Sequence, residues 1–398
     1  MSFVTNSSKS YCKIIQVLVL LKILNRNLIM KTRRYDLDWL RVISVLAVFL
    51  HHVFMPFNGD VFHIMNDEHS KLLDDIMVYF EQFRLPILFL ISGVGTVFAF
   101  SKRSWKSFII ERCKRLLIPL VFGVIFIVPL QVYYENIEDF QSFIESYPYL
   151  VSKLKVNHLW FIENLFYTSL IFIPFILFFR SSKSKVVKKY IERFSKQTGV
   201  LSWCIVLVLV RVISKDYFPS NSKSFLNLSS TLYYSFFFIG GIIIATNNVL
   251  WKLIKINRKR NLMITLFFSL LFYFYYLMPE EYIEPYLNLE NRWRLWYLVC
   301  ALVSWSVITT VLGYAQQYLN KPSYVLGKLN ESAYPFYILH QTVIIAIGYY
   351  VIQINSSIFI KVNLLLFSSL LVIFLIYYFI ISRLNFFRFL FGMRTKSF

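Results

Sequence analysis

The chain has 398 residues, of which 57% are hydrophobic, 19% aromatic and 16% charged, and its formal net charge is +21. A soluble domain of this length is far less apolar, so the composition argues against one and predicts a helical protein that crosses a membrane many times. The basic residues form short clusters between apolar segments, which argues against nucleic-acid binding and is typical of the signals that orient membrane proteins.

The first 29 residues differ from the rest of the chain. Their apolar run, from Ile14 to Leu24, is interrupted by Lys22 and is too short to span a membrane. No small-residue cleavage site comes after it, so it is a poor signal peptide. Met30 directly precedes a basic run and would make a natural start. We therefore interpret residues 1–29 as a dispensable amphipathic extension or a start-site artefact.

The remaining chain predicts an all-α fold, a polytopic bundle of about ten transmembrane helices. We expect a single integral membrane domain over residues 30–386 and a basic cytoplasmic tail over residues 387–398. The apolar segments long enough to span the membrane, or nearly so, are 38–57, 77–100, 116–134, 159–179, 199–214, 230–248, 261–278, 295–315, 333–353 and 362–382.

The loops between these segments alternate between basic and poor in Lys and Arg. Basic loops lie on the cytoplasmic side, so an even number of spans places both termini in the cytoplasm. We read the basic stretch 180–198 as a solvated cytoplasmic face rather than a binding element. The basic loops are 101–115, 180–198 and 251–260, and the opposite loops are 58–76, 135–158 and 279–291.

The first segment carries charge at both ends, with Asp38 and Arg41 before its apolar run and His51 and His52 after it. Arg41 and His52 are eleven residues apart, which returns to within roughly 20° of the same helix face and separates them by roughly 16 Å. Ionisable groups inside a membrane usually face a bundle interior or a wet cavity. The alternative is that Arg41 reaches lipid headgroups and His52 is a packing residue.

The second segment carries Glu81 and Arg84, three residues apart, in its outer part. A local ion pair that neutralises itself is the simpler explanation, and a lined cavity is the functional one. Pro86 frees a backbone carbonyl from the helix. Ser92 and Gly93 permit the close approach of another helix or of a slender ligand.

Arg112 and Arg115 close the first basic loop, just before the third segment. Two arginines three residues apart share a helix face and could hold phosphates through bidentate hydrogen bonds. A simple cytoplasmic anchor is the alternative.

Two further segments place histidines at membrane depth. His158 and Glu163 begin the fourth segment on the outer side and could hold a polar substrate, whereas nearby Trp160 is typical of the interfacial belt. His340 lies about 10 Å into the ninth segment from the cytoplasmic side, beside Gln341. An intramembrane histidine is a functional candidate by default, and a hydrogen-bonded core histidine is the alternative.

Five runs occur in an order that resembles the acyltransferase-3 family of polytopic membrane O-acyltransferases, over about residues 35 to 380. Within this family the chain is most similar to the branch that includes the osmoregulated periplasmic glucan succinylation protein. The runs are the Arg41-to-His52 spacing, Phe-Arg-Leu-Pro-Ile-Leu-Phe-Leu-Ile-Ser-Gly ending at Gly93, Arg112-x-x-Arg115-Leu-x-x-Pro119, His158-Leu-Trp-Phe, and Tyr334-Pro-Phe-Tyr-Ile-Leu-His340-Gln341.

The resemblance implies a multi-pass enzyme of the cytoplasmic membrane. It would take an acetyl or succinyl group from cytoplasmic acyl-coenzyme A as co-substrate and deliver it to a hydroxyl of an extracytoplasmic glycan of the cell envelope. The implied roles are an essential arginine and histidine for Arg41 and His52, contacts to the coenzyme phosphates for Arg112 and Arg115, and recurrent motif positions for Ser92, Gly93 and His340. Val94 stands where many members have an aromatic residue.

His52 would act as general base on the acceptor hydroxyl or as a transient acyl carrier, because histidine titrates near neutral pH. Neither a metal nor a nucleic-acid partner is expected, and the four cysteines contain no CxxC pair. The alternatives are a transporter or flippase that uses the intramembrane charges as a pathway, and a non-catalytic sensor or scaffold.

Overall fold

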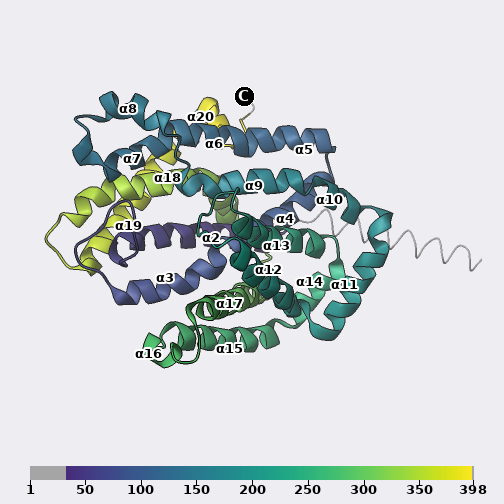
Figure 1. Cartoon of the computed structure of the whole chain (residues 1–398). Coiled ribbons are helices and arrows are strands. Elements are labelled where there is room, and N and C mark those ends of the chain that lie inside the picture. The colour runs from purple at the N-terminus through teal and green to yellow at the C-terminus, as the bar shows by residue number, and fades with distance from the viewer. Residues whose placement is uncertain (1–32, 397–398) are drawn as a thin grey trace, which may run out of the picture. The chain divides into compact units, whose positions relative to one another are not determined.

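The computed structural model describes residues 33–396, so the interpretation of residues 1–29 lies outside the described part. From Asp36 onward, the described residues form one compact unit. The described residues form helices and no strand (Figure 1). The α-helices are α2 Tyr35–Phe54, α3 Lys71–Arg84, α4 Pro86–Phe100, α5 Trp105–Arg112, α6 Ile118–Phe122, α7 Val128–Glu135, α8 Phe143–Ser152, α9 Trp160–Ile171, α10 Ile173–Arg180, α11 Lys185–Thr198, α12 Cys204–Tyr217, α13 Leu228–Ala245, α14 Asn248–Ile256, α15 Arg258–Tyr276, α16 Glu280–Ile283, α17 Leu289–Tyr318, α18 Tyr324–Ile352, α19 Ile358–Leu375 and α20 Asn385–Leu390.

Seven helical stretches of the described chain are long and apolar enough to cross a membrane, and two bent pairs raise this to as many as nine. The all-helical, multi-pass architecture agrees with the sequence, whereas the number ten and the orientation of the termini stay predictions. The expected segment 261–278 corresponds to α15, which is not among these candidates. The seven stretches are Tyr35–Phe57, Lys71–Phe100, Trp105–Glu135, Leu228–Ala245, Leu289–Tyr318, Tyr324–Ile352 and Ile358–Ile381.

Large apolar side chains are exposed in regular stripes on the outer helices. Leu266, Leu270 and Phe274 of α15 recur at four-residue intervals with exposed fractions of 56%, 71% and 67%. Phe367 and Phe374 form a similar stripe on α19. Water would make such continuous apolar surfaces unfavourable, so these faces are suited to hydrocarbon. The exposed face of α15 therefore fits a helix in contact with lipid, even though α15 as a whole is less apolar than the seven candidate spans.

Prolines set the breaks within several spans. Pro86 begins α4 directly after α3, because it lacks the N–H that would continue the hydrogen-bond ladder. Pro174 is the second residue of α10, and the stretch Phe143–Ile171 meets α10 at a bend of 50°. The basic segment 180–198 contains α11, and the stretch Ser182–Thr198 lies at 111° to the following span.

The span from α5 to α7 contains two wide turns of π-helix, Cys113–Leu117 and Gly123–Ile127. A proline comes two residues after each turn, and its ring clashes with the carbonyl four residues earlier. A wider turn accommodates that clash. The carbonyl that Pro129 displaces, that of Ile125, accepts a hydrogen bond of 2.9 Å from the Tyr147 hydroxyl. The arginine pair therefore lies at the first of these turns.

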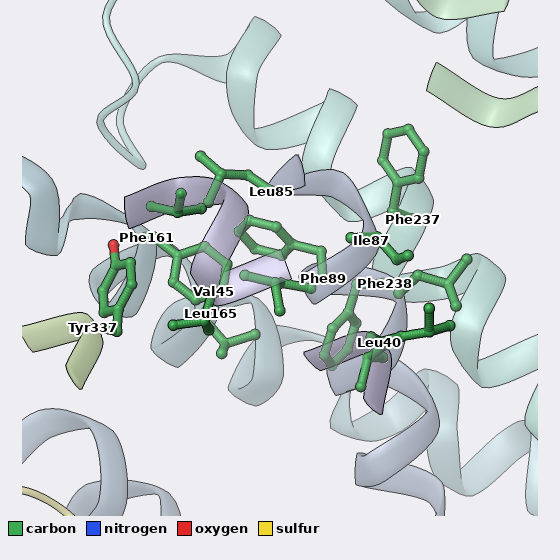
Figure 2. Packing of buried hydrophobic residues seen from close by; sticks show 14 of the residues in the cluster. Leu40, Val45, Leu85, Ile87, Phe89, Phe161, Leu165, Phe237, Phe238 and Tyr337 are labelled. Carbon is green, nitrogen blue, oxygen red and sulfur yellow. The ribbon is translucent and has the colours of Figure 1, made fainter. Parts of the chain in front are cut away.

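α4 and α13 pack backbone to backbone through two glycines. A Cβ atom at Gly93 would lie 2.1 Å from the Phe238 carbonyl oxygen, and one at Gly241 would lie 2.1 Å from the Leu90 carbonyl oxygen. Figure 2 shows apolar side chains of α4 and α13 around this contact, among them Phe89 and Phe238. The close approach predicted for Gly93 is therefore made by another helix.

α2 and α18 run in the same direction, as the predicted topology requires of the first and ninth segments. Three side-chain contacts join them, and the residue numbers of these contacts increase along both helices together. Arg41 meets Asn330, Phe49 meets Phe336 with ring centroids 5.2 Å apart, and His52 meets His340. Residues eleven apart on α2 therefore contact residues ten apart on α18.

Candidate active site

The centre of the candidate site is a contact between His52 of α2 and His340 of α18. His52 Nδ1 lies 3.1 Å from His340 Nε2 and 2.8 Å from the Val48 carbonyl oxygen. His340 Nδ1 lies 2.5 Å from the Tyr337 carbonyl oxygen. A carbonyl oxygen can only accept a hydrogen bond, so Nδ1 carries the proton in both neutral rings. His340 Nε2 then accepts from His52.

These assignments leave the second nitrogen of His52 with a lone pair. Nε2 of His52 forms no hydrogen bond with any residue in the described part of the chain. The His52 side chain is half-buried, while His340 is only 1% exposed. His340 thus fixes the orientation and the tautomer of His52 through a second hydrogen bond, and His52 presents a basic nitrogen that the protein does not occupy.

His158 supports His340 from α9's entry turn, Asn157–Leu159. The two imidazole rings lie edge to face with centroids 5.2 Å apart. His158 donates from Nε2 to the Ile338 carbonyl oxygen at 3.0 Å, and its Nδ1 accepts from Gln131 Nε2 at 3.1 Å. The Tyr337 hydroxyl donates to the His158 carbonyl oxygen at 2.5 Å. His158 is buried and fully bonded, so it positions its neighbours.

A further histidine, His63, joins the same network from the loop before α3. Gln341 Nε2 lies 3.0 Å from His63 Nε2 and 3.3 Å from Gln131 Oε1, which links His63 to His158. His63 Nδ1 lies 3.2 Å from a carboxylate oxygen of Glu135. With His51, whose ring lies 5.3 Å from that of His52, five of the six histidines of the chain gather here.

Sequence reasoning missed His63, Gln131 and Glu135. His63 and Glu135 lie in or beside the predicted outer loops, where polar residues are common. Gln131 lies in the third segment without any charged neighbour in sequence. Its signal was an amide in an otherwise apolar run, since such a group must find partners inside the bundle.

Arg41 lies at the other end of α2 and forms a separate contact. Its Nη1 atom lies 3.1 Å from Asp38 Oδ1 and donates to Asn330 Oδ1 at 2.8 Å. Val45 and Val48, on the stripe predicted to connect Arg41 with His52, are 8% and 2% exposed. The stripe thus faces the protein interior, and both polar ends of it contact α18.

Arg112 and Arg115 lie at the first wide turn of the third span. Arg112 Nη2 donates to Thr96 Oγ1 of α4 at 3.1 Å, and its guanidinium carbon lies 4.6 Å from the centre of the Phe108 ring. Arg115 pairs with Glu111 at 3.0 Å. Arg112 Nε is buried with no hydrogen-bond partner among residues 33–396. Only part of this pair's hydrogen-bonding capacity is used by the protein.

Glu81 and Arg84 do form the predicted contact, but a weak one, with Nη2 of Arg84 3.9 Å from Glu81 Oε1. Glu81 is held more closely by Lys223, at 3.0 Å. Arg84 is 3% exposed, and it interacts electrostatically with His51, His52 and His340. The structure therefore places Arg84 at the edge of the histidine network.

The other predicted residues lie away from the histidines or are not linked to them. Gly93 contacts α13, and the Ser92 carbonyl accepts from Thr96 Oγ1 at 2.7 Å within α4. Glu163 is half-buried and has no hydrogen-bond or ion-pair partner in the described chain. At the chain's end, Arg388 is buried and pairs with Glu331 of α18 at 2.7 Å, so the start of the expected tail packs against the bundle.

Comparison with known families gives one assignment. A family model described as an acyltransferase domain matches residues 34–383, nearly the whole chain. No curated protein and no solved structure is significantly similar to the sequence.

Proposed function

The chain belongs to the acyltransferase-3 family and is a multi-pass membrane acyltransferase, and from this premise we propose the direction and the substrates of its reaction. It moves an acyl group from cytoplasmic acyl-coenzyme A to a hydroxyl of an extracytoplasmic glycan, in the cytoplasmic membrane. Family membership favours this reading over the transporter that the intramembrane charges alone also allow. The branch with glucan succinylation stays a prediction.

The observation that carries the proposal is the unoccupied lone pair on His52 Nε2. As a general base, this nitrogen takes the proton of the acceptor hydroxyl while the hydroxyl oxygen attacks the thioester carbonyl. The C–S bond then breaks, and the departing thiolate receives the proton from Nε2. In the alternative route Nε2 itself attacks the carbonyl, and the C–S bond breaks to release the thiolate. The hydroxyl oxygen then attacks the acyl group, the C–N bond to His52 breaks, and the hydroxyl proton passes to the thiolate.

The separation of the polar groups supports a reaction shared between two sides of the membrane. Arg112 and Arg115 close the basic loop 101–115, which the predicted topology assigns to the cytoplasm, and paired guanidinium groups suit the phosphates of coenzyme A. His52 lies near the end of α2, eleven residues after Arg41, which lies near its start. An extended pantetheine arm would bring the thioester toward His52 while the nucleotide stays in the cytoplasm.

The test is transfer of radiolabelled acetyl and, separately, succinyl groups from coenzyme A into envelope glycan. Membranes would carry wild type, His52→Ala or the double variant Arg112→Ala/Arg115→Ala at equal protein level. Label that depends on wild type supports the proposal. Label in the glycan at the level of the His52→Ala background, with both donors, would overturn it. Rapid quenching and mapping of label on His52 would distinguish the acyl carrier from the general base.

A further inference from the structure

Arg84 is a buried cation whose charge the protein balances only in part. Its side chain is 3% exposed, and its Nε and Nη1 atoms are buried without a hydrogen-bond partner among the described residues. Its only ion-pair contact there is the 3.9 Å approach to Glu81. A guanidinium inside a bundle normally has all its donors paired, because lost hydration is otherwise not replaced. Arg84 is therefore equipped to bind something further.

The surroundings of Arg84 carry a surplus of positive charge. Glu81 is the nearby carboxylate, and it is shared with Lys223, whose ammonium group lies 3.0 Å away. Arg211, which lies over the ring of Tyr233, also interacts with Glu81. The group that would complete this arrangement is an anion.

The position of Arg84 connects that anion to the reaction. His51 interacts electrostatically with both Arg84 and Lys223, and its Nδ1 is a second buried polar atom without a hydrogen-bond partner in the described chain. The His51 ring lies 5.3 Å from the His52 ring. Two polar groups with unpaired buried atoms thus lie in the neighbourhood of the histidine at which acyl transfer is proposed.

We propose that Arg84 and His51 form a carboxylate-binding subsite next to His52, and that one substrate carries a free acid group at the reaction centre. A carboxylate fits better than a phosphate dianion, because Glu81 already neutralises part of the positive charge. The acid group belongs either to the acyl chain, as in the half-thioester of a short dicarboxylic acid, or to the acceptor, as in a uronic acid. The identity of the substrate, though not the subsite itself, rests on the proposed function.

Binding of free succinate to the purified full chain in detergent tests the subsite without any transfer. Wild type should bind succinate and not the neutral analogue succinamide. Arg84→Gln should weaken succinate binding at least tenfold, with Arg84→Lys intermediate. Glu81→Gln is the matched control, because it changes the same ion pair but removes a competing carboxylate, so its affinity should equal or exceed that of wild type. Equal succinate affinity in wild type and Arg84→Gln would overturn the proposal.

Thermal unfolding of each variant without ligand checks the fold. Loss of a partly paired buried cation should not lower the melting temperature of Arg84→Gln, so a large drop would identify a structural role instead.

Transfer assays then identify the source of the acid group. If the acyl chain carries it, Arg84→Gln lowers succinyl transfer at least tenfold more than it lowers acetyl transfer to a neutral glycan. If the acceptor carries it, the loss appears with a uronate-containing acceptor for both donors. An equal loss with every donor and acceptor would contradict the subsite. Wild type that binds succinate through Arg84 but transfers no acyl group would refute the proposed function alone.

Discussion

The histidine network and the arginine sites differ in how completely their buried nitrogen atoms are hydrogen-bonded. In the network of His52, His158 and His340, each ring nitrogen has a hydrogen-bond partner except Nε2 of His52. Arg84 and Arg112 instead keep buried nitrogen atoms that no described residue pairs. On our proposals, the protein therefore holds the base in place by itself, whereas anionic groups of the substrates would complete the pairing of the two cations.

The largest effect is expected from the one network nitrogen that the protein leaves open. His52→Ala should lower the rate constant for transfer roughly 10²- to 10⁴-fold, the usual range for a lost general base. The measurement is the initial rate of label transfer at saturating donor. His69→Ala is the control, because His69 is exposed in the loop before α3 and should retain wild-type activity. Activity of His52→Ala within a few fold of wild type would remove the network from the mechanism.

The arginine sites should respond in binding rather than in rate. Arg112→Ala/Arg115→Ala should raise KM for acyl-coenzyme A about 10- to 100-fold, because a charge-assisted hydrogen bond contributes about 1.5–3 kcal/mol. The rate at saturation should change little. Lys114→Ala on the same turn is exposed and serves as the control for net charge. An unchanged KM together with a reduced rate at saturation would make these arginines part of the catalytic end instead.

The support that His340 gives to His52 should have an intermediate effect. His340→Leu removes the acceptor for the His52 Nδ1 proton, and the lost hydrogen bond of about 1 kcal/mol corresponds to roughly a fivefold lower rate. His340→Gln places an amide near the position of Nε2 and should restore part of the activity. KM for the donor should stay constant in both variants. A rise in KM without a fall in rate would indicate that His340 contacts substrate directly.

The smallest effect on transfer should come from the helix contact behind the site. Gly93→Ala places a methyl group against the Phe238 carbonyl, and such overpacking costs about 1–3 kcal/mol in stability. The melting temperature in detergent should fall, with a modest loss of transfer. Gly95→Ala is a matched control two residues away, since a Cβ there meets nothing within 4 Å. Similar melting temperatures for the two variants would exclude the close packing of α4 and α13.

Local features could be predicted because they depend on neighbours in sequence. The apolar segments, the interruption at Pro86 and the shared face of Arg41 and His52 result from hydrophobic length, from proline's missing N–H and from the helix period. Gly93 was predicted to permit close approach, although the sequence did not show whether a helix or a ligand approaches. The alternation of basic loops with loops poor in Lys and Arg predicted that the first and ninth segments run in the same direction. The parallel course of α2 and α18 agrees with this prediction.

The sequence by itself determined an all-helical membrane protein, its family, and His52 and Arg41 as paired features of one helix face. Only the tertiary structure decided how the polar groups combine, because the partners are far apart in the chain. His52 and His340 are separated by 288 positions, and Gln341 and His63 by 278. Hydrogen bonds over such separations exist only once the helices have packed, and a buried group takes whichever partner the packing supplies. The same packing left Arg84 incompletely paired beside the histidines.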